Sequence, residues 1–181
     1  MLRTLERTQQ WGWVHRLTGI ATFTLLTVFS ARISIEMLPV PFTLQPLAVL
    51  LSGLVLGARD GALSQVAYLA LIAAGLPVDA RGLGAAAFAS PTAGFLIGFV
   101  ASAWTAGFIV ERSANRLWQR WIAGALALVV MYLFGCVWLL VIGRTPDVVY
   151  ENVIRPLFGL DLVKAFIAAA LTEGARTLLK R

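Results

Sequence analysis

Two oppositely charged residues, Asp161 and Lys164, lie in a segment that is otherwise apolar enough to cross a membrane. A charged side chain near the middle of a bilayer is costly, so such residues usually face the protein interior or a water-filled cavity. On a helix, the i, i+3 spacing places both side chains on one face, where they can pair. The pattern therefore predicts either a polar binding site inside an apolar protein or an ion pair that holds helices together.

The composition is that of an integral membrane protein. Of the 181 residues, 59% are hydrophobic and 13% are charged, far too apolar a balance for a soluble domain. The net charge of +6 does not indicate nucleic-acid binding, because Lys and Arg lie in short connections between apolar segments, where they fix topology and contact anionic lipid. The single cysteine, Cys136, lies in an apolar run, so we expect it to pack against other apolar residues. With only one cysteine, an intramolecular disulfide is excluded. We predict no metal, no cofactor and no catalytic residue.

The apolar segments predict an all-α membrane protein with a single integral domain over residues 1–181. A spanning helix needs about 20 mostly apolar residues. Six transmembrane helices are predicted, at about residues 14–35, 42–58, 61–76, 91–110, 121–142 and 157–174. The second and third are short and separated by a turn at Gly57–Gly61. Pro156 fits the first turn of the last helix, because its missing N–H is unpaired there anyway.

Basic residues predict that both termini are cytoplasmic, since connections on that side of a membrane are enriched in Lys and Arg. With this orientation four basic residues lie outside, namely Arg32, Arg81, Arg144 and Arg155. Ten lie inside, namely Arg3, Arg7, Arg16, Arg59, Arg112, Arg116, Arg120, Arg176, Lys180 and Arg181. Three proline-containing connections, at about 32–43, 77–92 and 144–156, are then on the outer side. Asp161 would lie about 7–8 Å below the outer end of its helix, within reach of an outside ligand.

The first outer connection leads into two candidate binding residues, Thr43 and Gln45. They place a hydroxyl and an amide at the mouth of the membrane domain, and Gln45 can both donate and accept hydrogen bonds, which suits a ureido or amide group. The alternative is that both residues merely cap a helix start. Tyr68 lies mid-span, and because a buried Tyr hydroxyl normally finds a partner, it could line a pocket or bridge helices.

The second outer connection is rich in Gly and Pro, which break a helix and let the backbone approach a ligand closely. Its end, around Pro91 and Thr92, could form part of a lid over an outer cavity, or be an ordinary surface connection. We expect Asp79 and Arg81 in this connection to be solvated. Four tryptophans are expected at the inner lipid interface, where amphipathic rings favour the head-group level: Trp11, Trp13, Trp118 and Trp121.

Several of these motifs together resemble one family. They are Pro39–Gln45, the Leu56–Gly57 turn, Gly75–Val78, Ser90–Phe99 and Asp161–Lys164. In this order, over about residues 38–170, they are similar to the BioY family, the biotin-specific substrate-binding (S) components of energy-coupling factor (ECF) transporters. The chain differs from the usual family pattern at Ala93 and Phe95, where Gly and Tyr are common, and at Asp79, where Phe is common.

The resemblance implies an ECF S-component bundle in the cytoplasmic membrane that captures biotin from outside. Its implied partners are a transmembrane coupling protein and two ATP-hydrolysing subunits, together with the lipid bilayer. The chain itself contains no phosphate-binding loop that could hydrolyse ATP. The small-residue Ala-x-x-x-Ala pattern often used for docking on the first helix is not found cleanly here. For the site, the resemblance points to Asp161 accepting from the ureido N–H groups and Lys164 donating to the ureido carbonyl or the carboxylate.

Three alternatives remain open at this point. The chain could be an S component for another vitamin, or a structural membrane subunit in which Asp161 and Lys164 form an assembly ion pair. The third is an intramembrane enzyme, although the sequence has no Gly-x-Ser-x-Gly or His-Glu-x-x-His motif.

Overall fold

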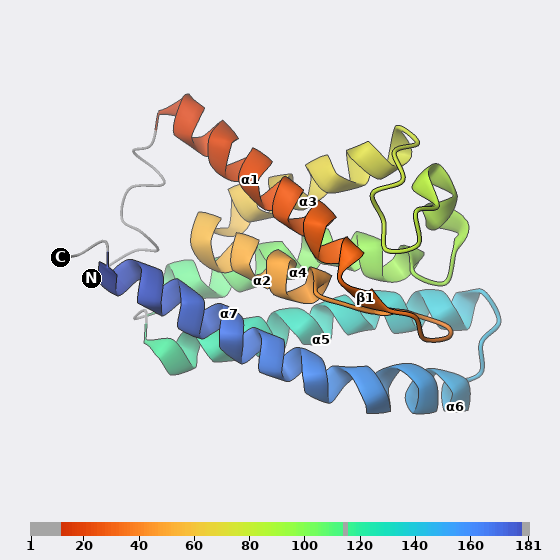
Figure 1. The fold of residues 1–181 in the computed structure, drawn as a ribbon. Helices are drawn as coiled ribbons and strands as arrows, with labels where there is room; N and C mark the ends of the chain where they lie inside the picture. Colours follow the sequence, from red (N-terminus) through yellow and green to blue (C-terminus); the bar gives the residue numbers. More distant parts are fainter. Residues whose placement is uncertain (1–11, 114–115, 179–181) are drawn as a thin grey trace.

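The computed structural model describes residues 12–113 and 116–178, which form a helical bundle with one two-stranded hairpin (Figure 1). The elements in chain order are α1 Trp13–Arg32, β1 Ser34–Ile35, β2 Phe42–Thr43, α2 Gln45–Leu56, α3 Ala58–Ala73, the 3₁₀-helix η1 Gly84–Ala89, α4 Ala93–Arg112, α5 Leu117–Val141, α6 Pro146–Val149, the π-helix η2 Tyr150–Phe158 and α7 Gly159–Leu178. The strands pair antiparallel, with Ser34 opposite Thr43.

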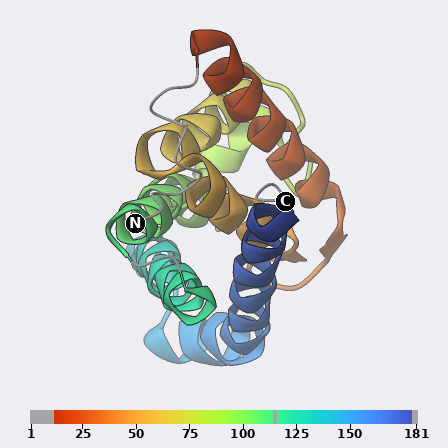
Figure 2. The same ribbon diagram turned by 90° about the vertical axis from the view of Figure 1, so that its left-hand side faces the viewer.

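Helix α4 lies at the centre of the packing and contacts α2, α3 and α5. Helix α7 packs against α5 and α2, and α1 packs against α3 and α2. Viewed along the bundle, α1 lies at one edge and α6 at the opposite edge (Figure 2). The α2–α7 contact brings the start of α2, which carries Gln45, close to the helix that carries Asp161. The packing of α2 against α7 therefore brings together the two candidate binding segments, one around Gln45 and the other around Asp161.

Glycines allow α2, α3 and α4 to pack closely. Gly57, with φ of +86°, lets α3 begin directly after α2 ends. A side chain at Gly53 would collide with the carbonyl of Ala103, and one at Gly107 would collide with the backbone of Ala58. Helices in a membrane gain stability chiefly from such close backbone contact, because lipid offers no hydrophobic driving force for their association.

A buried polar network ties α1 to the α2–α3 pair. The Gln65 amide donates to the hydroxyls of Ser52 (3.2 Å) and Ser64 (3.0 Å), and its two amide atoms lie 3.3 Å from the hydroxyl of Thr27. Thr24 also donates to the carbonyl of Ser64. All these groups are buried, so the network satisfies polar atoms that would otherwise be stranded among apolar side chains.

Most helix boundaries differ from the predicted ones by four residues or fewer, and in two places the local structure itself differs. The predicted start at residue 42 falls on strand β2, and α2 begins at Gln45 with Pro46 in its first turn. The prediction that Pro156 starts the last helix is wrong, because the chain is helical from Pro146 onward and Pro156 lies inside η2. Thr145 is the N-cap, so Pro146 is the proline whose missing N–H falls in a first turn. A π-helical stretch accommodates the ladder bond that Pro156 cannot make.

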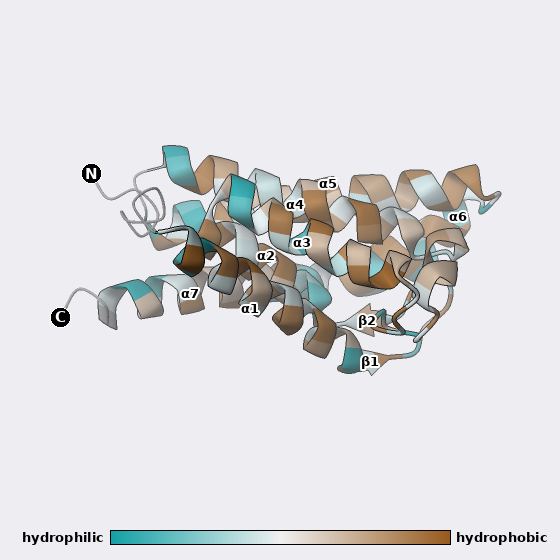
Figure 3. Cartoon of the chain, turned by 90° about the horizontal axis from the view of Figure 1, so that it is seen from above, coloured by the Kyte–Doolittle hydropathy of each residue, from teal (hydrophilic) through white to brown (hydrophobic). Residues whose placement is uncertain are grey.

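Within residues 12–113 and 116–178, three helices, α1, α4 and α5, are long and apolar enough to cross a membrane, and α2 is a shorter apolar helix. Apolar residues dominate the middle of the bundle (Figure 3). The start of α1 and the end of α7 lie at the same end of the bundle, and the β-hairpin, the α3–α4 connection and α6 lie at the other (Figure 1).

The six membrane spans and the cytoplasmic location of both termini stay predictions. Trp13, Trp118 and Trp121 are exposed, as lipid contact requires, whereas Trp11, Arg3, Arg7, Lys180 and Arg181 lie outside the described residues.

Candidate ligand-binding site

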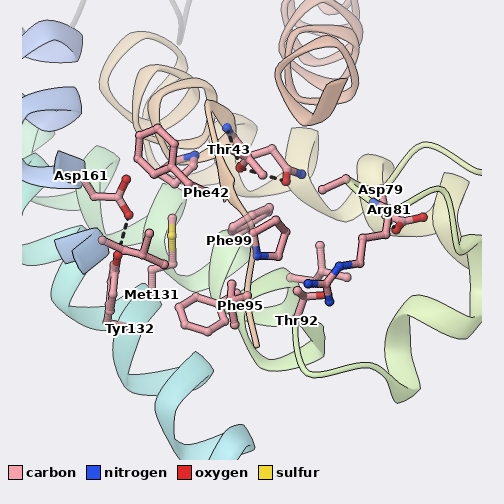
Figure 4. A pocket seen from close by; sticks show the side chains of 17 residues that line it. Phe42, Thr43, Asp79, Arg81, Thr92, Phe95, Phe99, Met131, Tyr132 and Asp161 are labelled. Carbon is pink, nitrogen blue, oxygen red and sulfur yellow. Dashed lines mark hydrogen bonds between the residues drawn. The ribbon is translucent and has the colours of Figure 1, made fainter. Parts of the chain in front are cut away.

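A cavity opens at the end of the bundle that carries the hairpin, and Asp161 is in its wall (Figure 4). It holds about 600 Å³ of atom-free space, its mouth included. Five parts of the chain line it: the hairpin through the start of α2, the α3–η1 connection, the first half of α4, the middle of α5, and the η2–α7 segment. These parts are far apart in sequence, so the cavity exists only in the folded bundle.

Asp161 and Lys164 form a buried ion pair, with 2.5 Å between Lys164 Nζ and Asp161 Oδ1. The predicted pairing is therefore confirmed. The exposed fractions of the two residues are only 4% and 5%. Lys164 also donates to the carbonyl of Thr43 (2.6 Å) and lies 3.6 Å from the centroid of the Phe42 ring. The second carboxylate oxygen of Asp161 accepts from the Tyr132 hydroxyl at 2.6 Å (Figure 4).

In this cluster the negative charge of Asp161 is balanced by the positive charge of Lys164, and each carboxylate oxygen is held by one donor. Asp161, Tyr132 and Phe42 line the cavity, whereas Lys164 is not among the lining residues and lies behind Asp161 and Phe42. In a low-dielectric surrounding, a paired acid and base favour a neutral polar guest over a net charge. The cluster therefore offers a carboxylate acceptor whose two oxygens are held in place by the Lys164 ammonium and the Tyr132 phenol.

A second polar cluster is formed by Thr43, Gln45 and Tyr68. The Gln45 amide donates to the Tyr68 hydroxyl (2.8 Å), which lies 3.3 Å from the carbonyl of Val78. The Thr43 hydroxyl accepts from the Gln45 backbone N–H and lies 3.2 Å from its side-chain oxygen. Thr43 and Gln45 line the cavity, and Tyr68 supports Gln45 from behind. Thr43 thus faces the cavity and also bonds the first residue of α2, whose N-cap is Leu44, and its role in ligand binding stays a prediction.

Thr92 lines the cavity, whereas its neighbour Pro91 is not among the lining residues. The Thr92 hydroxyl lies 2.7 Å from that of Ser90, whose backbone carbonyl accepts from the Trp138 indole at 2.9 Å. The α3–α4 connection is therefore fastened to α5. Of the candidate residues at this end of the loop, only Thr92 is placed for ligand contact.

The expectation of solvated side chains is wrong for Asp79, whereas Arg81 is partly exposed. Asp79 is 4% exposed, and its carboxylate accepts from the backbone N–H groups of Gly84 (2.8 Å) and Arg81 (3.1 Å). The Arg81 guanidinium reaches across to the first outer connection, where it contacts the carbonyls of Met37 and Pro39. Both residues line the cavity. Asp79 is buried because it satisfies backbone donors that the tight loop leaves unpaired.

Sequence reasoning missed the aromatic wall of the cavity. Phe95 and Phe99 of α4 and Met131 and Tyr132 of α5 cover one side of it (Figure 4). The Tyr132 ring packs edge-on against that of Phe95, with 5.6 Å between centroids, and against that of Phe158 at 5.1 Å. One signal was available in the sequence: Tyr132 carries a hydroxyl in the middle of a long apolar helix, where such a group needs a partner.

Comparison with known proteins assigns the class and then the family. The fold and site define a multi-pass membrane protein with a buried polar site, and a solved structure shares that fold. It is the 2.1 Å crystal structure of the S-component for biotin from an ECF-type ABC transporter, with a TM-score of 0.79, 27% identity, and coverage of 91% of this chain and 92% of that one.

Sequence comparison gives the same result. The family model of the BioY family matches residues 4–181. A biotin transporter BioY of Rhizobium etli is 40% identical over 151 residues, covering 77% of this chain and 79% of the relative. One of Thermotoga maritima is 35% identical over 159 residues, covering 87% and 94%. This chain belongs to the BioY family. Family and fold are those of a transporter S component, not of an enzyme.

Proposed function

We propose that this chain captures biotin from outside the cell and serves as the substrate-specific subunit of an ECF-type transporter in the cytoplasmic membrane. The observation that carries the proposal is the paired acid and base at the end of an otherwise largely apolar cavity, in a chain of the BioY family. Biotin has a matching shape: a neutral ureido ring with two N–H donors and one carbonyl, an apolar thiophane ring and a valerate carboxylate.

A pose for biotin can be proposed from the residues that line the cavity. The ureido N–H groups donate to Asp161, and the ureido carbonyl accepts from Lys164, which would turn from its contact with the Thr43 carbonyl to reach the ligand. Phe95 and Phe99 cover the apolar ring system. Most of a small ligand's surface is buried in such sites, and a few oriented polar groups set the pose. Gln45 and Thr43 then contact the polar edge of the ring from the hairpin side.

The valerate chain points toward Arg81 in this pose. Arg81 and Asp161 lie on opposite sides of the view into the cavity (Figure 4). A guanidinium is a good carboxylate partner because its donors match the two oxygens. Arg81 also contacts Met37 and Pro39, so a carboxylate there would join the two outer connections around the ligand.

We propose that this chain transports biotin together with partner subunits. We propose both termini in the cytoplasm and six spans, with the biotin cavity opening outward. The ten-to-four distribution of basic residues supports this orientation. ATP hydrolysis would come from two partner ATPases, linked to this chain through a transmembrane coupling protein.

The test is a ligand panel on the purified chain in neutral detergent, read by calorimetry and by the melting temperature. A ligand that binds only the folded state raises that temperature by mass action. We expect biotin to bind, and biotin methyl ester to bind more weakly through loss of the carboxylate charge at Arg81. A shift with thiamin or riboflavin but not biotin would overturn the substrate, and no shift with any vitamin would favour a structural subunit.

A further inference from the structure

A second cavity lies between the start of α1, the α2–α3 junction and the end of α4, at the opposite end of the bundle from Asp161. It holds about 950 Å³ of atom-free space, its mouth included. Three arginines line it: Arg16, Arg59 and Arg112. Two acids, Asp60 and Glu111, line it as well. The proposed biotin site uses none of these residues.

Both acids are already engaged by the protein. The carboxylate of Asp60 is buried and accepts two hydrogen bonds from the Arg16 guanidinium, at 2.6 and 2.8 Å. Glu111 accepts from the backbone N–H of Ala58 at 2.8 Å, so its charge lies on the N-terminus of α3. Helix N-termini carry partial positive charge, which Glu111 offsets. The cavity therefore presents a positive rim despite its two carboxylates.

Arg59 and Arg112 form that rim, and both are exposed. The Arg112 guanidinium lies 3.5 Å from the centroid of the Phe108 ring, and it donates to the Phe108 carbonyl at 3.3 Å. The contact with the ring occupies one face of the guanidinium, and the hydrogen bond uses one of its N–H groups. An Arg side chain has five N–H donors, so further donors remain for an anion such as a phosphate.

An apolar strip leads away from this rim along α4. The rings of Phe108 and Trp104 stack with 4.6 Å between centroids, and Trp104 is 47% exposed. Residues 104, 108 and 112 are spaced by four, so they follow one another along a single helix face. A cation at the helix end followed by exposed aromatic rings matches an amphiphile with an anionic head and an apolar chain.

We propose that this cavity binds the phosphate head group of an anionic phospholipid from the inner leaflet. Arg59 and Arg112 contact the phosphate, and an acyl chain lies along Phe108 and Trp104. The inner-leaflet assignment rests on the orientation proposed above. Basic pockets between helices on the cytoplasmic side are a general means of holding anionic head groups, and each basic residue contributes roughly fivefold to affinity.

The test is a titration of the delipidated chain in neutral detergent with phosphatidylglycerol and with phosphatidylcholine, counting bound lipids by native mass spectrometry. We expect phosphatidylglycerol to be retained preferentially. The double variant Arg59→Gln/Arg112→Gln should lose about 25-fold in affinity for it. The control Arg144→Gln/Arg155→Gln removes the same charge from the other end of the molecule and should stay within about twofold. Trp104→Ala should weaken retention of the long-chain lipid.

Other outcomes would overturn the proposal. Equal retention in the two double variants would place the lipid elsewhere. If inorganic phosphate displaced the lipid as well as phosphatidylglycerol does, the site would be one for free phosphate. Loss of assembly with partner subunits while lipid retention stays intact would make it a protein-docking surface. Biotin affinity should be unchanged in all of these lipid-site and control variants. A failure of the lipid proposal can therefore be distinguished from a failure of the biotin proposal.

Discussion

Helix α7 takes part in two buried charged clusters, and they differ in what surrounds them. Near its start, Asp161 and Lys164 are linked at 2.5 Å and are completed by Tyr132, the Thr43 carbonyl and the Phe42 ring. Near its end, Glu173 contacts Arg176 of the same helix at 3.4 Å and Arg120 of α5 at 3.2 Å. The first cluster has its acid in the wall of a cavity. The second bridges two packed helices.

The contrast shows that a buried charge alone does not identify a binding site. Arg120 is only 1% exposed, more buried than Asp161 or Lys164. What distinguishes the first cluster is a carboxylate that faces open space, flanked by donors and by aromatic rings that would cover a ligand. We therefore expect changes in the first cluster to alter ligand binding and changes in the second to alter stability.

The largest effect is expected from Asp161→Asn. The change removes the acceptor for the ureido N–H groups and leaves the Lys164 ammonium without its counter-ion. We expect biotin affinity measured by calorimetry to fall at least about 100-fold, because two ureido N–H groups lose hydrogen bonds to a charged acceptor, each contributing about 1.5–3 kcal/mol. Lys164→Ala should weaken binding comparably. Both proteins should still fold, as judged by a monodisperse elution profile.

Asp147→Asn is the matched control for this change, because it alters an exposed acid of α6 at the same end of the molecule. Its affinity should stay within about twofold of the original. Wild-type-like binding in both Asp161→Asn and Lys164→Ala would remove the basis for the proposed biotin site.

Tyr132→Phe should have an intermediate effect. It keeps the ring contacts with Phe95 and Phe158 and deletes only the hydroxyl that donates to Asp161 at 2.6 Å. Without this bond the Asp161 carboxylate loses one of the groups that orient it toward the ligand, so biotin affinity should fall about tenfold, equivalent to about 1.4 kcal/mol. Tyr150→Phe removes an exposed hydroxyl and should change nothing. An unchanged affinity in Tyr132→Phe would show that the phenol does not position the carboxylate.

Much of the site could be predicted from residue types and spacing. Asp161 and Lys164 are conspicuous because charges are rare in apolar segments, and their i, i+3 spacing fixes a common helix face. Thr43 and Gln45 come shortly after Pro39 and Pro41, which hold the backbone extended at the entry to an apolar segment. For such residues, local sequence already carries the reason for the position.

The remainder depends on contacts that no local pattern encodes. Asp79 looks like a solvated loop residue, yet the loop folds back so that its carboxylate binds the N–H groups of Gly84 and Arg81. Phe95 and Phe99 look like ordinary core residues of α4, and only the packing of α4 against α5 turns them toward the cavity. The start of the last helical segment was missed for a related reason, since either Pro146 or Pro156 could begin a helix, and only the structure shows the Thr145 cap.

The smallest effect on biotin is expected from Glu173→Gln, which tests the other half of the contrast. The change replaces a charged partner of the deeply buried Arg120 by a neutral one, so stability should fall by about 1–3 kcal/mol, seen as a lower melting temperature in detergent. Glu151→Gln breaks an exposed i, i+4 pair with Arg155 and should cost no more than about 0.5 kcal/mol. Biotin affinity should stay within about twofold in both, because neither acid lines the cavity. A large loss of biotin affinity in Glu173→Gln with an unchanged melting temperature would mean that the two ends of α7 are coupled, and the division into a binding cluster and a stabilising cluster would fail.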